Sequence, residues 1–332
     1  MCRPTINELQ SAPRGKTGWP WTEESPPLPE TMPDGSPWPR VSIVTPSYNQ
    51  GQFLEETIRS VLLQGYPDLE YIIIDGGSTD ESLDIIKKYE PWLSGWVSES
   101  DCGQSHAINK GLKRSTGEFW AWLNSDDIYM PGIIFRSIKA LQENSKVAVV
   151  YGDGLWINED SIPIHVYRSG PLDARSLLTG ASGHGIPQAT AFMRREAVES
   201  VGGLNEKLNM AMDYDLWIKL SFHYDLQYLP GQPFAGVRSH VNMKTRKNRL
   251  EAYMEDLQVL RENLNHPLRP HGVTLFRNRE YVTGNLGVAR NYLAKNMPLK
   301  ALPYILKAVN ADFFFVMKKP FKYFNKILTA KK

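Results

Sequence analysis

The chain has 332 residues, enough for one large or two medium-sized domains, and its 42% hydrophobic and 22% charged residues are ordinary for a globular protein. The formal net charge of +2, without an arginine-rich run interleaved with aromatic residues, argues against a nucleic-acid-binding protein. The two cysteines, Cys2 and Cys102, form no redox or metal motif, so we expect a reducing, cytoplasmic location.

Residues 1–40 are rich in Pro, Gly and Trp. The first ten residues are polar, which predicts that no signal peptide is present. The prolines exclude a regular helix or a central strand. Trp19, Trp21 and Trp38 would be costly to expose to water, so we expect an extended arm packed on the following domain rather than a disordered leader.

From residue 41 onward, short β-branched or aromatic runs alternate with segments of helical periodicity. The predicted strands are 41–47, 69–75, 95–100, 118–124 and 146–153. The predicted helices are 52–64, 80–92, 103–117 and 132–144. Strands alternating with helices predict a mostly parallel sheet with helices on both faces.

Polar residues follow several of these strands, at the sheet edge where ligands bind in such folds. Asp126 and Asp127 are adjacent at one strand end, where their charges repel. A divalent cation would offset that repulsion, and Mg²⁺ is commonly held by one or two carboxylates plus substrate phosphates. The alternative is that Asp126 caps the helix after Pro131 or that Asp127 is merely solvated.

Asp75 ends another strand, in "IIIDGGSTD". It is suited to accept hydrogen bonds from a base or a ribose, while the glycines that follow let the backbone approach a ligand. The alternative is an ordinary turn residue, with Ser78 or Asp80 capping the next helix. The segment lacks the spacing of a Rossmann dinucleotide fingerprint or a P-loop.

Four segments, taken in this order, resemble the family-2 glycosyltransferases over roughly residues 40–245: "VSIVTPSYNQGQFLEETIRSVLLQ", "IIIDGGSTD", "AINKGLKRSTGEFWAWLNSDD" and "MDYDLWIKL". The resemblance implies a GT-A-type, Rossmann-like α/β fold. It also implies inverting transfer of a sugar from a nucleotide diphosphate-sugar, most commonly a UDP-sugar, with Mg²⁺ or Mn²⁺ as the cofactor.

The resemblance also assigns roles to individual positions. Residues 124–126 match the DxD metal motif with Asn in first position, so that Asp126 is the principal metal ligand and His240 a second one. Asp75 matches the acid that holds the nucleobase, with Gly76 in place of a second acid. The positions implied to bind the donor are Pro46, Tyr48, Asp75, Asn109, Gly111, Ser125, Arg238 and Lys244.

Asp213, in "AMDYDLW", matches the catalytic base of the family, with Met212 replacing a Glu. A carboxylate suits that task if it reaches the acceptor hydroxyl. Asp215 is the alternative, expected to face solvent or to cap a helix. The candidates on the acceptor side are His184, Gln188 and Arg194.

Beyond residue 246 the pattern is helical, with an amphipathic segment at 249–264 and two helices within 280–309 that join near 296–298. The tail, 311–332, interleaves aromatic residues with lysines, which is typical of peptides that lie on anionic membranes. The alternative is a helix packed on the protein. The expected domains are an arm (1–40), a GT-A domain (41–245) and a helical region (246–332).

The expected function is a metal-dependent, hexosyltransferase-type enzyme of surface polysaccharide or glycolipid synthesis, at the inner face of the membrane. One alternative is a catalytically impaired nucleotide-sugar-binding or scaffold protein, because Gly76, Asn124 and Met212 depart from fully acidic motifs. The other is a nucleotidyltransferase, although "VTPSYNQGQ" lacks the basic residue of its phosphate loop.

Overall fold

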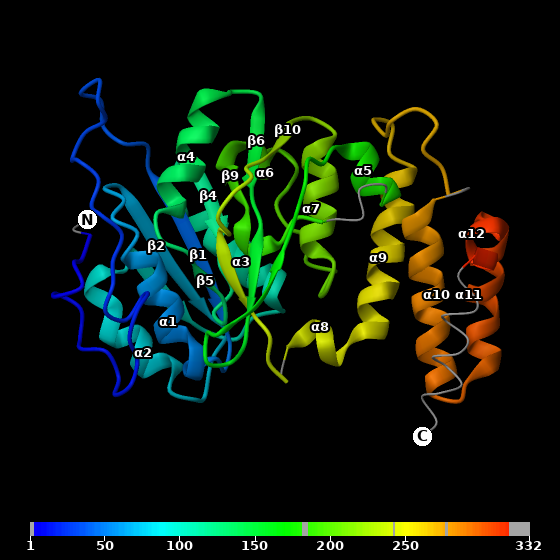
Figure 1. Ribbon diagram of the computed structural model, residues 1–332, viewed down its shortest axis with the longest axis horizontal. Helices are drawn as coiled ribbons and strands as arrows, with labels where there is room; N and C mark the ends of the chain where they lie inside the picture. The colour runs from blue at the N-terminus through cyan, green and yellow to red at the C-terminus, as the bar shows by residue number, and fades with distance from the viewer. Residues whose placement is uncertain (1–2, 181–184, 242, 276–277, 319–332) are drawn as a thin grey trace. The chain divides into compact units, whose positions relative to one another are not determined.

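The computed structural model describes residues 3–180, 185–241, 243–275 and 278–318, and the chain divides into two compact units (Figure 1). Unit 1 consists of residues 1–171, 185–206 and 224–240. Unit 2 consists of residues 172–184, 207–223 and 241–332. The chain therefore passes from unit 1 to unit 2 three times.

Unit 1 is built on a seven-stranded sheet in the order β10-β6-β9-β4-β1-β2-β3. Its strands are β1 (Val41–Ser47), β2 (Leu69–Asp75), β3 (Gly95–Ser98), β4 (Phe119–Trp122), β6 (Val147–Tyr151), β9 (Phe192–Arg194) and β10 (Asp225–Tyr228). Only β9 runs antiparallel to its neighbours in this sheet, so the predicted mostly parallel sheet is confirmed.

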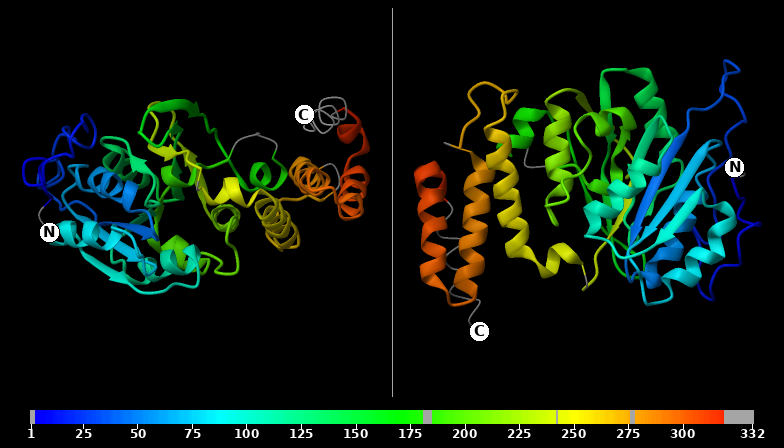
Figure 2. Two further views of the ribbon diagram at one scale, coloured as in Figure 1. Left: turned by 90° about the horizontal axis from the view of Figure 1, so that it is seen from below. Right: turned by 180° about the vertical axis from the view of Figure 1, so that it is seen from behind.

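Helices cover both faces of this sheet (Figure 2). They are α1 (Gly51–Leu62), α2 (Ser82–Tyr89), α3 (Gln104–Arg114), α4 (Ile133–Glu143) and α6 (Arg195–Ser200), with short 3-10 turns η1 (Glu90–Trp92) and η2 (Gln188–Thr190). Every residue of β1 is buried. On one face Ile43 joins the core cluster that contains Leu54 of α1. On the other face Val44 lies so close to α3 that a Cβ at Gly111 would come within 2.2 Å of it.

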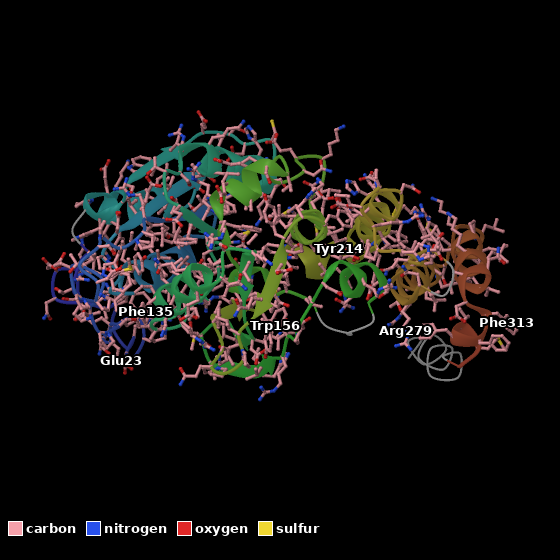
Figure 3. All side chains as sticks on the ribbon, turned by 90° about the horizontal axis from the view of Figure 1, so that it is seen from above. Glu23, Phe135, Trp156, Tyr214, Arg279 and Phe313 are labelled. Carbon is pink, nitrogen blue, oxygen red and sulfur yellow. The ribbon has the colours of Figure 1, made fainter. Side chains whose placement is uncertain are left out.

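A second, four-stranded sheet has the order β5-β11-β7-β8 and was not predicted from the sequence. Its strands are β5 (Ile128–Tyr129), β11 (Ala235–Arg238), β7 (Gly154–Ile157) and β8 (Pro163–Tyr167). Trp156 marks β7 in Figure 3. Because β11 pairs with β5, the end of β11 lies beside the turn that contains Asp126 and Asp127.

The N-terminal segment belongs to unit 1 and packs on the rest of that unit, with Trp21 and Trp38 buried. Arg59 of α1, itself almost fully buried, donates hydrogen bonds to the carbonyl oxygens of Gln10, Pro20 and Trp21 at 2.9–3.0 Å. One guanidinium therefore fixes two separate stretches of an extended segment that has almost no regular structure of its own.

Unit 2 is helical. It contains α5 (Ala174–Thr179), α7 (Met212–Ser221), α8 (Lys244–Lys247), α9 (Arg249–Leu264), α10 (Arg279–Ala294), α11 (Pro298–Ala311) and α12 (Phe313–Lys318). The predicted pair of helices is confirmed as α10 and α11, joined at 295–297. Within the described residues, no helix combines the length and the apolar character needed to cross a bilayer.

Candidate functional site

The ends of β1 and β2 lie side by side, with Ser47 opposite Asp75, and the Gly76 amide donates to the Ser47 carbonyl oxygen at 2.8 Å. Pro46 is buried within β1. Tyr48, the next residue but one, is 62% exposed. An aromatic ring therefore stands open at the carboxyl edge of the sheet, where the sequence predicted a nucleotide.

Asp75 is fully buried and closes the turn that follows β2. Its Oδ2 accepts hydrogen bonds from the amides of Gly77 (3.1 Å) and Ser78 (2.9 Å) and from Oγ of Ser98 (2.6 Å). Its Oδ1 accepts a hydrogen bond from Oγ of Ser78 at 2.5 Å. Gly77 has a φ of 81°, a left-handed conformation that favours glycine. These are the contacts of a turn residue, and a direct contact with a nucleobase stays a prediction.

The two adjacent carboxylates after β4 face different ways. Asp126 has a side chain that is 21% exposed, and its Oδ2 lies 3.0 Å from Nε2 of His240. Asp127 is buried, and its Oδ1 accepts a hydrogen bond from the backbone amide of Arg238 at 2.9 Å. Burial, followed by the nearby charge of Asp126, raises the pKa of Asp127. The carboxylate of Asp127 thus contacts the backbone of β11, and the carboxylate of Asp126 points towards His240. This separation reduces the repulsion between the two charges.

The structure brings together the two residues expected to hold a metal, Asp126 and His240. The His240 ring is 2% exposed and packs 5.1 Å from the ring of Phe53, and its Nδ1 has no hydrogen-bond partner among the described residues. In the described part of the chain no group of three His, Cys, Asp or Glu side chains forms a metal cage. A carboxylate with an imidazole fits a cation whose remaining ligands are phosphate oxygens and water.

Asn124, the first residue of the DxD-like motif, is held by two glutamines. Its Oδ1 accepts from Nε2 of Gln104 (2.8 Å), and its Nδ2 donates to Oε1 of Gln188 (3.0 Å). Gln188 also donates to the carbonyl oxygen of Trp122 at the end of β4 (2.8 Å). Gln188, expected on the acceptor side, therefore lies next to the motif, where it orients the amide of Asn124. Ser125, the middle residue, is buried.

Arg238 was expected to neutralise a donor phosphate. Its guanidinium is fully buried and donates to the Asp126 carbonyl oxygen (2.7 Å), Oε2 of Glu56 (3.0 Å) and Oγ of Ser161 (2.9 Å). It also lies over the Phe53 ring, 4.7 Å from the ring centroid. This side chain reaches the backbone of the Asp126 turn and ties it to α1 and to the loop between β7 and β8.

We expect Arg238→Met to lower the free energy of unfolding by about 3–5 kcal/mol, because the substitution leaves the buried carboxylate of Glu56 without its ion-pair partner. Urea denaturation followed by fluorescence measures this change. The control is Arg40→Met, which removes a pair with Asp68 whose members are both well exposed, so that about 0–1 kcal/mol is expected. Equal losses in the two variants would contradict the role given to Arg238.

The donor-side residues of α3 make packing contacts in the structure. Nδ2 of Asn109 donates to the Leu204 carbonyl oxygen (2.9 Å) and to Oε1 of Glu206 (2.8 Å), while Oδ1 accepts from the Leu204 amide (3.0 Å). Gly111 permits the close approach of α3 to β1. These two residues therefore position α3, and their contact with a donor stays a prediction.

Arg194, an acceptor-side candidate, is not brought to this edge. It pairs with Phe119 at the start of β4, and its Nε donates to the carbonyl oxygen of Val147 at the start of β6 (3.0 Å). These are the amino ends of the two strands, so Arg194 lies at the opposite edge of the sheet from Asp126. His184, the remaining acceptor-side candidate, falls outside the described residues.

In unit 2, Asp213 occupies the first turn of α7, where its Oδ1 accepts a hydrogen bond from the amide of Tyr214 at 2.8 Å (Figure 3 labels Tyr214). Burial raises the pKa of Asp213 to about 6. Burial also raises the pKa of Asp256 to about 7, with a smaller contribution from the charge of Asp213. A carboxylate that titrates just below neutral pH suits proton abstraction at physiological pH.

The alternative base, Asp215, was expected to face solvent or to cap a helix, and this is wrong. It is 2% exposed, its Oδ2 lies 2.6 Å from Nζ of Lys219, and Asn263 approaches its Oδ1 at 3.4 Å. Asp215 therefore anchors α7 to α9. Lys244 begins α8 in unit 2, and burial lowers the pKa of its amine.

Three acids in unit 1 were missed by the sequence reasoning: Glu56, Asp101 and Asp153. Asp153 is buried and accepts from the amide of Ser169 and the hydroxyl of Tyr228, both at 2.8 Å. Asp101 and Asp153 each follow a strand within a few residues, which is the signal that singled out Asp75. Glu56 lies three residues after Phe53, on the buried stripe of α1, where a charged residue requires a partner.

Comparisons with known proteins bear on this site. Residues 42–202 match the family described as glycosyl transferase family 2. An uncharacterized glycosyltransferase of Rickettsia prowazekii is 30% identical over 229 residues, which cover 66% of this chain and 70% of that protein. Another, from Rickettsia conorii, is 28% identical over 280 residues, covering 78% of this chain but 43% of the relative, so the chain spans less than half of that protein's length.

Two solved structures share the fold. The Staphylococcus aureus TarS fragment 1–349 in complex with UDP-GlcNAc has a TM-score of 0.58 at 17% identity, covering 81% of this chain and 79% of that one. The mannosyltransferase PcManGT from Pyrobaculum calidifontis, in complex with GDP-Man and Mn²⁺, has a TM-score of 0.55 at 21% identity, covering 82% and 74%. At these identities the likeness establishes the GT-A fold alone.

Proposed function

The chain belongs to the family 2 glycosyltransferases, and from this premise we propose that it is an inverting, metal-dependent enzyme that transfers a hexosyl group from a nucleotide diphosphate-sugar to a hydroxyl acceptor. The observation that carries the proposal is the pair formed by the partly exposed Asp126 and the buried His240, 3.0 Å apart at the carboxyl edge of the sheet. Tyr48 stands exposed at the same edge.

Asp126 and His240 would hold a divalent cation, Mg²⁺ or Mn²⁺, which supplies positive charge to the departing diphosphate. Asp213 takes the proton of the acceptor hydroxyl. At the same time the acceptor oxygen attacks the anomeric carbon of the donor sugar from the face opposite the diphosphate. The new C–O bond forms as the bond to the diphosphate breaks, and the anomeric configuration inverts. Asp213 is thus left protonated and returns its proton to solvent.

A screen of the full chain against UDP- and GDP-sugars, with Mg²⁺ or Mn²⁺ and hydroxyl acceptors, tests the proposal by the release of nucleoside diphosphate. We expect release with one class of donor, abolished by a chelator. Calorimetry on the same samples detects binding without turnover, which would favour the scaffold alternative. Absence of both binding and release for every nucleotide would overturn the proposal. Family membership already favours glycosyl transfer over nucleotidyl transfer.

We further propose that the C-terminal region lies on an anionic membrane, in keeping with an acceptor for polysaccharide or glycolipid synthesis. In α11, Leu299, Leu302 and Leu306 are exposed, and Leu299 is 85% exposed. Phe313 and Phe314 of α12 are exposed as well. The lysine-rich residues 319–332 lie outside the described part of the chain, and their place in this surface is inferred from sequence.

The full chain is expected to float with anionic vesicles at physiological salt, whereas a chain ending at Asn310 is expected to float less, because each lysine near such a surface contributes about 1 kcal/mol. Vesicle flotation measures the difference, with neutral vesicles as the control. If neither chain floats, or if the truncated chain unfolds, the tail is part of the packed protein and the membrane assignment is wrong.

A further inference from the structure

Glu255 of α9 is buried, and both of its carboxylate oxygens accept hydrogen bonds from the segment that precedes α7. Its Oε2 accepts from the amides of Asn209 (2.9 Å), Met210 (2.7 Å) and Ala211 (3.1 Å). Its Oε1 accepts from the amide of Asn209 as well, at 3.0 Å. Three consecutive backbone amides therefore converge on one side chain that belongs to a different helix.

These contacts fix the start of α7. The helix begins at Met212, and the residue before it, Ala211, makes no capping hydrogen bond with its own side chain. The amides at the amino end of a helix need acceptors, and negative charge is favourable there. Glu255 supplies both from α9. Hydrogen bonds to an ionised acceptor are roughly twice as strong as neutral ones, so the segment is held firmly.

Asp213, the proposed base, lies two residues after Ala211, in the first turn of α7. Burial, followed by the charge of Asp213, raises the pKa of Asp256 to about 7, so α9 passes beside Asp213 at the residue that follows Glu255. The hydrogen bonds from the three amides use the roughly four lone-pair sites of the Glu255 carboxylate. Glu255 therefore acts on a substrate only through α7.

The remainder of α7 has anchors of its own. The hydroxyl of Tyr214 donates to the Leu177 carbonyl oxygen of α5 at 2.8 Å, and Asp215 pairs with Lys219 at 2.6 Å. Without Glu255, the helix would thus remain attached to unit 2, while its first turn would lose a restraint. Displacement of a reacting group by about 1 Å can cost about 100-fold in rate.

We propose that Glu255 is a positioning residue for sugar transfer: its carboxylate fixes residues 209–211, so that Asp213 meets the acceptor hydroxyl in the geometry needed to take its proton. The proton ends on Asp213, and Glu255 stays ionised throughout. The inference rests on the proposed function and deepens it. It gives a task in the reaction to α9, which lies beyond the residues 42–202 of the family match.

The test is steady-state kinetics of full-length variants with the donor found by the screen. Glu255→Ala is expected to lower kcat by about 10- to 100-fold, because the base is no longer held in place. Calorimetry should show unchanged affinity for the nucleoside diphosphate, because the proposed metal ligands, Asp126 and His240, belong to unit 1.

Two conservative variants separate position from charge. Glu255→Gln keeps an oxygen where Oε2 accepts from all three amides, so most of the native kcat should return. Glu255→Asp keeps the charge, but its side chain is one methylene shorter and withdraws from the amides, so kcat should stay low. A high kcat in Glu255→Asp with a low kcat in Glu255→Gln would show that the charge matters and would overturn the positioning role.

The matched control is Asn278→Ala, which removes another buried cap in unit 2. Asn278 is 2% exposed, accepts from the amide of Tyr281 at 3.0 Å and donates to the Leu178 carbonyl oxygen at 2.7 Å. The control should lower the thermal midpoint while kcat, measured below that midpoint, stays native.

The outcomes distinguish this inference from the function on which it rests. If Glu255→Ala keeps the native kcat, or if Asn278→Ala loses as much, the positioning role is wrong while the proposed function stands. If the native chain transfers sugar from no donor, the proposed function fails and this role with it. Thermal unfolding shows whether each variant is folded. If Glu255→Ala is not, the comparison of Glu255→Gln with Glu255→Asp decides.

Discussion

Replacement of Asp213 by Asn is expected to lower kcat by about 10²–10⁴-fold, the range for loss of a positioned general base. The amide is nearly isosteric, and its oxygen keeps the hydrogen bond from the backbone amide of Tyr214. Donor affinity should therefore stay nearly unchanged, since the proton is taken only in the transition state. Steady-state kinetics with the donor found by the screen, together with calorimetry of the nucleoside diphosphate, separates the two effects.

The same assignment gives a pH dependence. Asp213 acts as a base only when ionised, and its pKa is raised to about 6. We expect kcat/KM to be level above that pH and to fall tenfold for each unit below it, whereas the residual rate of Asp213→Asn should lack this acid limb. Asp215→Asn, two residues along α7, is the control and should keep the limb, because its carboxylate is paired with Lys219. A normal rate in Asp213→Asn with loss in Asp215→Asn would reverse the two roles.

The second large effect is expected at Asp126. Asp126→Ala should lower kcat/KM by about 10²-fold or more, because the charge that a bound metal supplies to the leaving group is worth several kcal/mol. Nucleoside diphosphate binding should also lose its dependence on divalent metal. The thermal midpoint should fall as well, because the buried ring of His240 loses its hydrogen-bond partner, a loss of about 1–3 kcal/mol in stability. Calorimetry with and without a chelator provides the binding measurement.

Asp127→Ala is the matched variant, because it removes the neighbouring carboxylate. It leaves the buried amide of Arg238 without an acceptor, so we expect a loss of about 1–3 kcal/mol in stability. Metal-dependent binding should persist. Equal metal dependence in the native chain and in Asp126→Ala would remove Asp126 from the metal site.

The first half of the main sheet was predictable because its strands are buried runs. β1, β2, β4 and β6 consist almost entirely of buried residues, and such runs of β-branched and aromatic residues are a strong local signal. The alternating helices carry apolar stripes of the right period. In this part of the chain the local sequence pattern agrees with the burial seen in the fold, so the sequence alone was enough to predict the strands and helices.

The second sheet carried no such signal. β5 has two residues, and β8 is exposed along most of its length, so neither shows a buried run. Their pairing depends on β11, more than 100 residues after β5, and a local pattern holds no information about so distant a partner. β9 was also missed, because a strand of three residues is too short to show a pattern.

For the site, the sequence placed the carboxylates at strand ends but not their hydrogen-bond partners. Asp126 and His240 lie 3.0 Å apart, whereas the guanidinium of Arg238 is occupied by Glu56 and by backbone carbonyl groups. A charged residue beside a motif gives the same sequence pattern whether it faces a ligand or the interior. Which of these holds is decided by which chain segments pack around it, and that becomes visible only in the fold.

The interleaving of the two units has a consequence for how this protein is made. The chain contributes residues 172–184 and 207–223 to unit 2 before residues 224–240 return to unit 1 with β10, β11 and Arg238. During synthesis, the main sheet therefore lacks β10, and the turn that contains Asp126 lacks the guanidinium of Arg238, until residue 240 has left the ribosome. A gene fragment that ends at residue 202, where the family match stops, would encode neither β10 nor β11. Neither unit is encoded by one continuous stretch of the gene. Recombination therefore cannot exchange one unit for another as a single segment.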